Sequence, residues 1–130
     1  MDRFLLASAA VFGLVGVGAG AFGAHALRAK VSPERVVSFE TGARYLLLHA
    51  PVVLAVVWMR TAGPDSASET VAGLTLVAGG VVFAGSLFAL ALTGRARWGA
   101  VTPIGGVLLL VGWGALLVAA LTAPLRFHVL

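Results

Sequence analysis

The sequence contains no cysteine, which excludes disulfide bridges and thiolate chemistry. Charged residues are scarce as well: they make up 11% of the 130 residues, against about 25% in an ordinary globular domain. What the chain has instead is apolar residues, which account for 60% of it. Ordinary domains are only about 45–50% apolar. Both departures are typical of a protein that lies in a lipid bilayer.

The few charges are confined to short stretches that separate four long uncharged runs. Because a membrane-spanning helix needs roughly 20 mostly apolar residues, these runs predict an all-α bundle of four transmembrane helices. The second run is short, and we expect an amphipathic lead-in from Phe39 to extend it. Four spans leave no room for a separate soluble domain, so residues 1–130 are expected to form one integral membrane domain. The predicted spans are residues 4–23, 43–60, 70–93 and 102–123.

The connection between the first two spans carries its own helix signal. Ser32-Pro33-Glu34-Arg35 combines an N-cap residue, a proline at the first helical position and an acidic first turn. This pattern predicts a short amphipathic helix along the membrane interface. Gly42 is then expected to bend the chain into the second span.

The basic residues are distributed unevenly about the spans. Three of them flank the spans on the side of the termini: Arg3, Arg60 and Arg126. Six lie in or beside the connections between spans 1 and 2 and spans 3 and 4: Arg28, Lys30, Arg35, Arg44, Arg95 and Arg97. The positive-inside rule therefore predicts both connections in the cytoplasm and both termini outside, in the cell's inner (cytoplasmic) membrane.

Glycines in the stretch GVGAGAFGAH, residues 16–25, have the spacing of the dinucleotide-binding fingerprint G-x-G-x-x-G. That fingerprint requires a preceding strand and a βαβ unit, whereas these glycines end a long apolar run. Small residues instead allow neighbouring membrane helices to approach closely, as in the G-x-x-x-G pattern. We therefore predict helix packing at six glycines: Gly16, Gly20, Gly23, Gly80, Gly105 and Gly106.

Polar side chains in or near a membrane are costly, so they are the candidate functional residues. The candidates are His25, Glu40, Arg44, Tyr45, His49 and Ser86. We expect His25 and His49 to lie near the cytoplasmic boundary and to face each other across the first two helices. Ser86 is expected to hydrogen-bond either across a helix interface or back to the carbonyl four residues earlier in its own helix. The indole N–H of Trp113 is expected to find a polar partner such as Ser86.

Three interpretations of these polar residues stay open. They can serve the structure, by bonding to helix-end carbonyls or reaching to headgroups. They can form a lipid-headgroup, small-ligand or proton-relay site. A metal or haem site is the third, but His25 and His49 are too few for a closed zinc site, and we predict neither metal nor cofactor.

Four short motifs follow one another along the chain, each present once. They are Gly20-Ala21-Phe22-Gly23-Ala24-His25, Tyr45 with His49, Phe83-Ala84-Gly85-Ser86-Leu87, and Thr102-Pro103-Ile104-Gly105-Gly106. Together they resemble the DUF423 family of small membrane proteins, which includes transmembrane protein 256. The resemblance covers most of the chain and implies a four-helix integral membrane protein. It implies no activity, because the family's function is unknown.

Two functions are compatible with these observations. The first is association in the membrane, as a homo-oligomer or as an accessory subunit of a membrane complex, with lipids and other membrane proteins as partners. The alternative is binding or transport of a lipid or small ligand at a polar site near the cytoplasmic ends of the first two helices. No complete catalytic constellation is present, which argues against an enzyme. The net charge of +4 forms no basic patch for nucleic acid.

Overall fold

The computed structural model describes residues 1–122. This range folds into α1 (Asp2–His25), α2 (Pro33–Ala62), α3 (Ala67–Thr93) and α4 (Thr102–Thr122), with short 3₁₀ helices at Leu27–Ala29 and Ala96–Ala100. Each of the four long helices is long and apolar enough to cross a membrane, with α1 counted together with the 3₁₀ turn that follows it and α4 together with the one that precedes it. The predicted all-α architecture with four membrane-capable helices is therefore confirmed. The end of the predicted fourth span, Arg126 and His128 lie outside the described residues.

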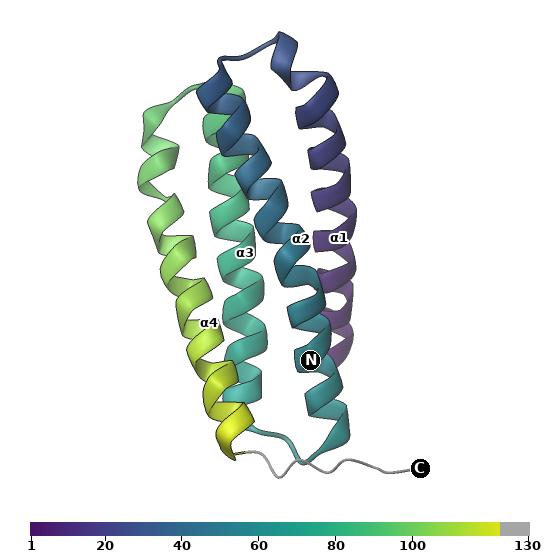
Figure 1. Ribbon diagram of the computed structural model, residues 1–130. Helices are drawn as coiled ribbons and strands as arrows, with labels where there is room; N and C mark the ends of the chain where they lie inside the picture. The colour runs from purple at the N-terminus through teal and green to yellow at the C-terminus, as the bar shows by residue number, and fades with distance from the viewer. Residues whose placement is uncertain (123–130) are drawn as a thin grey trace.

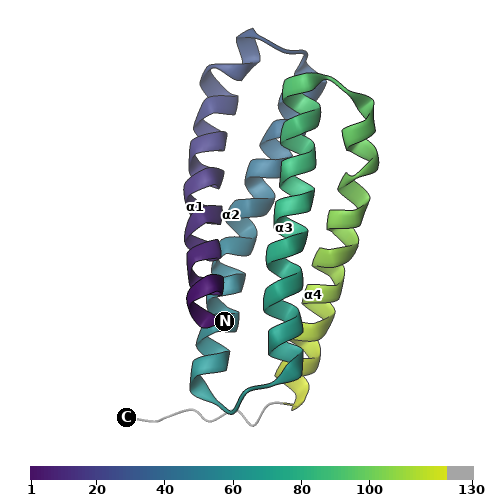
Figure 2. The same ribbon diagram turned by 180° about the vertical axis from the view of Figure 1, so that it is seen from behind.

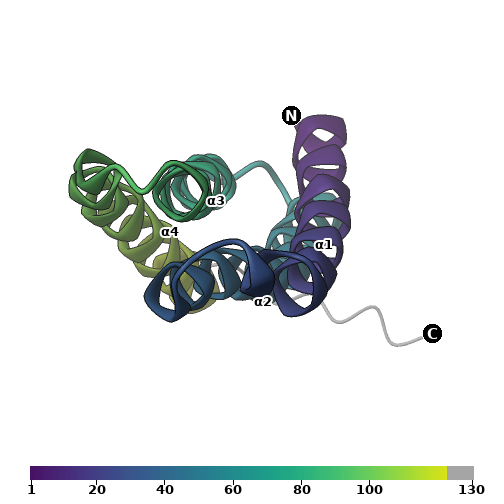
Figure 3. The ribbon, with the colours of Figure 1, turned by 90° about the horizontal axis from the view of Figure 1, so that it is seen from above.

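The helices follow one another in space as they do in the sequence. α1 packs on α2, α2 on α3, and α3 on α4. Seen along the bundle, α1 and α4 lie on opposite sides of the α2–α3 pair (Figure 3). The α1–α2 and α3–α4 connections lie at one end of the bundle, here called the basic end. The N-terminus and the α2–α3 connection lie at the other end, here called the terminal end (Figures 1 and 2).

The first residues of α2 correct one expectation. α2 runs unbroken from Pro33 to Ala62, so the predicted short amphipathic helix is the beginning of α2 rather than a separate element. Gly42 does not bend the chain there. Its missing side chain instead makes room for α3, because a Cβ at Gly42 would lie 2.9 Å from Cε1 of Phe88.

The end of α3 shows why a glycine is needed at the basic end. Gly94 follows the helix with φ of 68°, a left-handed conformation that glycine adopts without steric cost. Its N–H donates to the carbonyl oxygen of Leu90 at 2.8 Å, which closes the last turn. The chain can therefore reverse within a few residues and return as α4.

The core of the bundle is formed by apolar side chains of all four helices. Leu5, Phe12, Leu46, Val53, Val56, Leu76 and Leu109 are buried in it. The outer faces are apolar too: Leu14, for example, is 76% exposed. In water such a surface would be unstable, whereas in a membrane it meets acyl chains.

Candidate functional site

The polar residues of α2 are separated along the helix rather than gathered at one place. Near the basic end, Oε1 of Glu40 accepts a hydrogen bond from Nη2 of Arg28 at 3.2 Å. Arg44, one turn further, is exposed. An ion pair on the surface stabilises a protein only slightly. Glu40 and Arg44 therefore form no enclosed site with each other.

Tyr45 and His49 lie deeper and form an aromatic cluster that joins three helices. The ring of Tyr45 stacks on Phe83 of α3, with centroids 4.2 Å apart, and on His49, at 5.8 Å. His49 is 6% exposed, and its Nδ1 lies 2.7 Å from the carbonyl oxygen of Tyr45. Its Nε2 lies 3.2 Å from Nε1 of Trp113 on α4. This hydrogen bond is a direct link between α2 and α4.

The two partners of His49 define its hydrogen positions. A backbone carbonyl can only accept a hydrogen bond, so Nδ1 of His49 carries the proton and donates to Tyr45. An indole N–H can only donate, so Nε2 accepts from Trp113. Both nitrogens of the imidazole are therefore occupied by hydrogen bonds. In this arrangement neither nitrogen is available to bind a metal or to pass on a proton.

The indole N–H of Trp113 thus finds a polar partner, as expected, but this partner is His49 and not Ser86. Ser86 is buried, donates to the carbonyl oxygen of Phe83 at 2.9 Å, and lies 2.7 Å from Oγ1 of Thr102. Because Thr102 begins α4, this contact ties α3 to the start of α4. Ser86 therefore does bond across a helix interface, as expected.

His25 and His49 do not face each other. His25 is exposed at the end of α1. Two residues earlier, Gly23 packs against Phe39, near the beginning of α2. His49 lies ten residues further along α2 than Phe39, or about 15 Å along the axis at 1.5 Å per residue. The sequence-predicted residues therefore do not converge on a single site.

The predicted glycines differ in their surroundings. Three lie where a Cβ would collide with a neighbouring helix: Gly16, Gly80 and Gly105. A Cβ at Gly23 would make a tight contact, 3.1 Å from Cδ1 of Phe39 on α2. A Cβ at Gly106 would make only an ordinary contact, 4.0 Å from Cδ2 of Phe83. A Cβ at Gly20 would have no neighbouring atom within 4 Å among residues 1–122, so the expectation of close packing is wrong there for the described part of the chain.

An ionic network at the terminal end was not foreseen from the sequence. The side chain of Arg60, at the end of α2, is only 6% exposed. Its Nε donates to Oδ1 of Asp2 at 2.7 Å, its Nη1 to Oγ1 of Thr70 at 2.7 Å, and its Nη2 to Oδ1 of Asp65 at 3.2 Å. One guanidinium thus joins α1, α2 and α3. One sequence signal could have revealed this network. Because consecutive spans run antiparallel, the beginning of the first span, with Asp2, and the end of the second, with Arg60, must lie at the same end of the bundle.

A second arginine has a similar structural role at the basic end. Nε of Arg35, in the first turn of α2, donates to the carbonyl oxygen of Ala91 at 2.7 Å. Carbonyls in the last turn of a helix have no partner within the helix. Arg35 therefore caps α3 and holds it to the beginning of α2.

Comparison with known proteins agrees with this architecture. The family described as "Protein of unknown function (DUF423)" matches residues 19–106. The UPF0382 membrane protein YwdK of Bacillus subtilis is 38% identical over 111 residues, which cover 85% of this chain and 90% of that protein. The UPF0382 inner membrane protein YgdD of Escherichia coli K12 is 38% identical over 122 residues, which cover 92% of this chain and 91% of that protein. No solved structure matches the chain.

Proposed function

The chain belongs to the DUF423 family of membrane proteins, and from that premise we propose that it acts by lateral association in the membrane, as a homo-oligomer. The observation that carries the proposal is a stripe of mostly small residues on α1 that are exposed or half-buried in the described chain. We call it the α1 outer face. It consists of Ala10, Gly13, Val17, Gly20 and Ala24.

The α1 outer face is suited to close helix contact. Gly13 and Gly20 are seven residues apart, so they lie on the same side of the helix at about 100° per residue. A Cβ at either glycine would meet no atom within 4 Å. In a bilayer, helices associate through van der Waals contact rather than through a hydrophobic driving force, and small residues allow that contact. A second helix can therefore approach the backbone of α1 closely along this face.

Glycine within a helix also has a cost that a partner would offset. Relative to alanine, a glycine in a helix interior is less favourable by about 0.8–1.0 kcal/mol. At Gly16, close packing against Leu47 and Ala43 of α2 accounts for the missing side chain. At Gly13 and Gly20 no neighbour within the described residues 1–122 does so. Contact with α1 of a second copy would account for both glycines, because the same face serves both partners in a two-fold dimer.

The alternative, ligand binding or transport near the basic end of α1 and α2, has less support. Glu40 already accepts a hydrogen bond from Arg28, and both ring nitrogens of His49 are occupied. Association as an accessory subunit would use the same α1 outer face with a different partner.

We place the basic end in the cytoplasm, because four exposed basic residues lie in its connections: Arg28, Lys30, Arg95 and Arg97.

The absence of cysteine allows a direct test by cross-linking. We expect Gly20→Cys to form a disulfide-linked dimer on oxidation in membranes, because cysteines bridge only when their Cα atoms lie within about 7 Å. Gly114→Cys on α4 is the matched control, since Gly114 is equally open. We expect no dimer from it.

Equal cross-linking at both positions would contradict the proposal, because it would indicate random collision. A Gly20→Cys product that contains a different protein, and no second copy, would overturn the homo-oligomer in favour of an accessory subunit. No cross-linked product from Gly20→Cys, in membranes where the chain is present, would also refute the proposal.

A further inference from the structure

A groove lies between α1 and α3, and α2 forms its floor. Its hollow has a volume of about 180 Å³ and an apolar lining, which includes Val15 of α1, Leu46 of α2 and Phe88 of α3. It is open on its outer side, where Val15 is 40% exposed and Val81, on the opposite rim, is 57% exposed. Figure 2 shows this side of the bundle, with α1 and α3 in front of α2. An apolar group can therefore enter the groove from the side.

The two ends of the groove are filled by side chains. Toward the terminal end α1 and α3 touch, because a Cβ at Gly80 would lie 2.6 Å from Cζ of Phe12. Toward the basic end, Leu27 is buried in a cluster with Phe39, and Phe88 packs against that cluster. The way into the groove is therefore from the hydrocarbon of the bilayer and not from the water at either end.

The length of the groove matches one leaflet of the bilayer. It lies beside residues 81–88 of α3, in the half of that helix nearer to the basic end. A partner helix that crosses the membrane needs a groove along the whole bundle, whereas this one stops about halfway along α1 and α3, at the contact of Phe12 with Gly80. An acyl chain extends through about 15 Å, half of a hydrocarbon core of about 30 Å. The groove therefore fits an acyl chain better than a helix.

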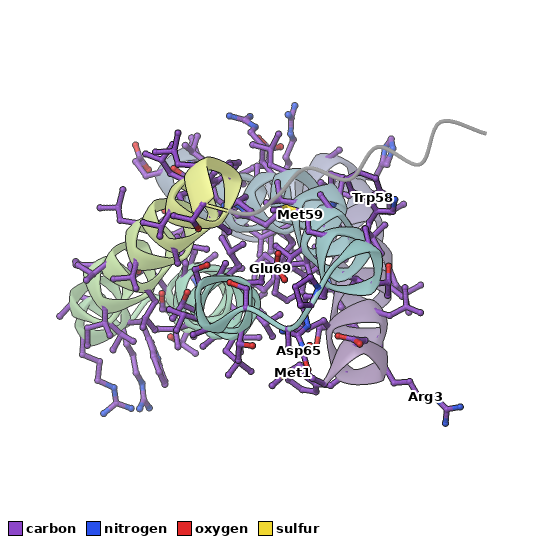
Figure 4. The ribbon with its side chains drawn as sticks, turned by 90° about the horizontal axis from the view of Figure 1, so that it is seen from below. Met1, Arg3, Trp58, Met59, Asp65 and Glu69 are labelled. Atoms are coloured by element: carbon purple, nitrogen blue, oxygen red, sulfur yellow. The ribbon has the colours of Figure 1, made fainter. Side chains whose placement is uncertain are left out.

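The charges at the two ends of the bundle indicate the headgroup of such a lipid. At the terminal end the described charged groups balance: Asp2, Asp65 and Glu69 against Arg3, Arg60 and the amino group of Met1. Figure 4 shows that end, where Arg3 extends outward and Glu69 is directed into the bundle. The basic end carries six basic residues and only two acidic ones, Glu34 and Glu40. A lipid with an anionic headgroup is therefore attracted to the basic end.

Arg35 offers a specific contact to that headgroup. Arg35, Phe39 and Leu46 are spaced by four and seven residues, so they lie on the face of α2 that forms the floor of the groove. Nε of Arg35 donates to Ala91, but its Nη1 and Nη2 have no hydrogen-bond partner among residues 1–122. Eleven residues separate Arg35 from Leu46, which is about 16 Å along the helix, or the depth of one leaflet. The two free nitrogens can bind a phosphate through parallel hydrogen bonds.

We propose that the groove binds one acyl chain of an anionic phospholipid from the leaflet at the basic end, and that Arg35 binds its phosphate. The site contains neither Glu40 nor His49. It is also separate from the α1 outer face, because Val15 in the groove and Val17 on that face point about 200° apart round α1. The inference is therefore independent of the proposed association.

The test measures lipid binding to the full chain in mild detergent by native mass spectrometry, with dioleoyl phosphatidylglycerol as the anionic probe. Gly85→Leu fills the groove, because Gly85 lines it and a Cβ there would meet no atom of the described residues within 4 Å. Gly114→Leu on α4 is the matched control, since a Cβ at Gly114 would be equally free of neighbours in residues 1–122. We expect one phosphatidylglycerol on the wild type and on Gly114→Leu, and its loss from Gly85→Leu.

A second pair of variants tests the headgroup. Arg35→Lys keeps the charge but lacks the planar fork that binds phosphate through two bonds. We expect it to bind phosphatidylglycerol about tenfold more weakly than the wild type does, which corresponds to one hydrogen bond to a charged group. Arg97→Lys, at an exposed arginine of the same end, is its control and should bind as the wild type does. Dioleoyl phosphatidylcholine, whose headgroup has no net charge, should bind to the wild type more weakly than phosphatidylglycerol.

Melting temperatures give a second measurement that does not depend on the Arg35 variant. A ligand that binds only the folded chain stabilises it. Phosphatidylglycerol should therefore raise the melting temperature of the wild type and of Gly114→Leu, and leave that of Gly85→Leu unchanged. Equal rises in all three would refute a site in the groove.

Several binding results would overturn the proposal. They are no phosphatidylglycerol on the wild type, equal binding by Gly85→Leu and Gly114→Leu, equal binding of the two lipids, and equal effects of Arg35→Lys and Arg97→Lys. A dimer that is present in the wild type and lost in Gly85→Leu would assign the groove to a second copy of the chain, and would overturn the lipid as well.

Discussion

The contact between α3 and α4 gives a sharp prediction, because two adjacent glycines of α4 differ in what surrounds them. A Cβ at Gly105 would lie 2.7 Å from Cα of Phe83 and would also collide with the backbone nitrogen of that residue. A Cβ at Gly106 would lie 4.0 Å from Cδ2 of Phe83, an ordinary contact. We therefore predict opposite effects of alanine at the two positions.

The magnitude follows from the geometry. Backbone atoms cannot rotate out of the way, so Gly105→Ala must move the two helices apart by about 1 Å to reach a favourable carbon–carbon distance of about 3.5–4.0 Å. Overpacking of this kind costs about 1–3 kcal/mol. Both variants gain up to about 1 kcal/mol of helix propensity from alanine. The difference between them is therefore the overpacking cost alone, and Gly105→Ala should be the less stable by about 1–3 kcal/mol.

The assay is reversible unfolding in mixed detergent micelles, followed by circular dichroism for the wild type and both variants. We expect Gly106→Ala to equal or exceed the wild type and Gly105→Ala to fall below its neighbour. Indistinguishable stabilities of the two variants would refute the reasoning, because the α3–α4 contact at Phe83 would then not be tight.

The same unfolding assay tests two polar links. Trp113→Phe removes the donor to His49 and should lower the free energy of unfolding by about 0.6–1.5 kcal/mol. Trp58→Phe, at a side chain 63% exposed, should change the stability little. Equal losses of stability in the two variants would contradict the α2–α4 link. Arg60→Met should cost about 1.5–3 kcal/mol, the range for hydrogen bonds to charged groups. Arg3→Met is its control, and an Arg60→Met chain as stable as that control would show that the network contributes nothing.

The architecture could be predicted from the sequence because a bilayer leaves few choices. Every buried backbone group in lipid must be bonded within its own helix, so the length of an apolar run decides where a span lies. That argument needs no knowledge of tertiary contacts, and it located all four helices. It did not locate their ends: the chain was predicted to bend at Gly42 between two helices, but α2 continues through it from Pro33 to Ala62. The glycine instead leaves room for Phe88 of α3.

The candidate site was predicted less well, because its contacts depend on the rotation of each helix about its axis. Gly16 and Gly20 are four residues apart and differ by only about 40° in direction. Yet a Cβ at Gly16 would collide with α2, whereas a Cβ at Gly20 would meet no atom of the described residues within 4 Å. The pairing of His49 with Trp113 joins residues 64 positions apart. No local pattern specifies such a contact. The same holds for Arg60 and Asp2, which are 58 positions apart.

The most direct test of the account is whether the chains associate through the α1 outer face in a bilayer. The measurement is fluorescence energy transfer between donor- and acceptor-labelled chains in proteoliposomes, at several protein-to-lipid ratios. Gly20→Leu places bulk on that face. Gly18→Leu is the control, because a Cβ at Gly18 likewise meets no atom of the described residues within 4 Å but points about 200° away round the helix. We predict transfer in the wild type and in Gly18→Leu and its loss in Gly20→Leu; a wild type without transfer, or transfer unchanged by Gly20→Leu, would contradict the account.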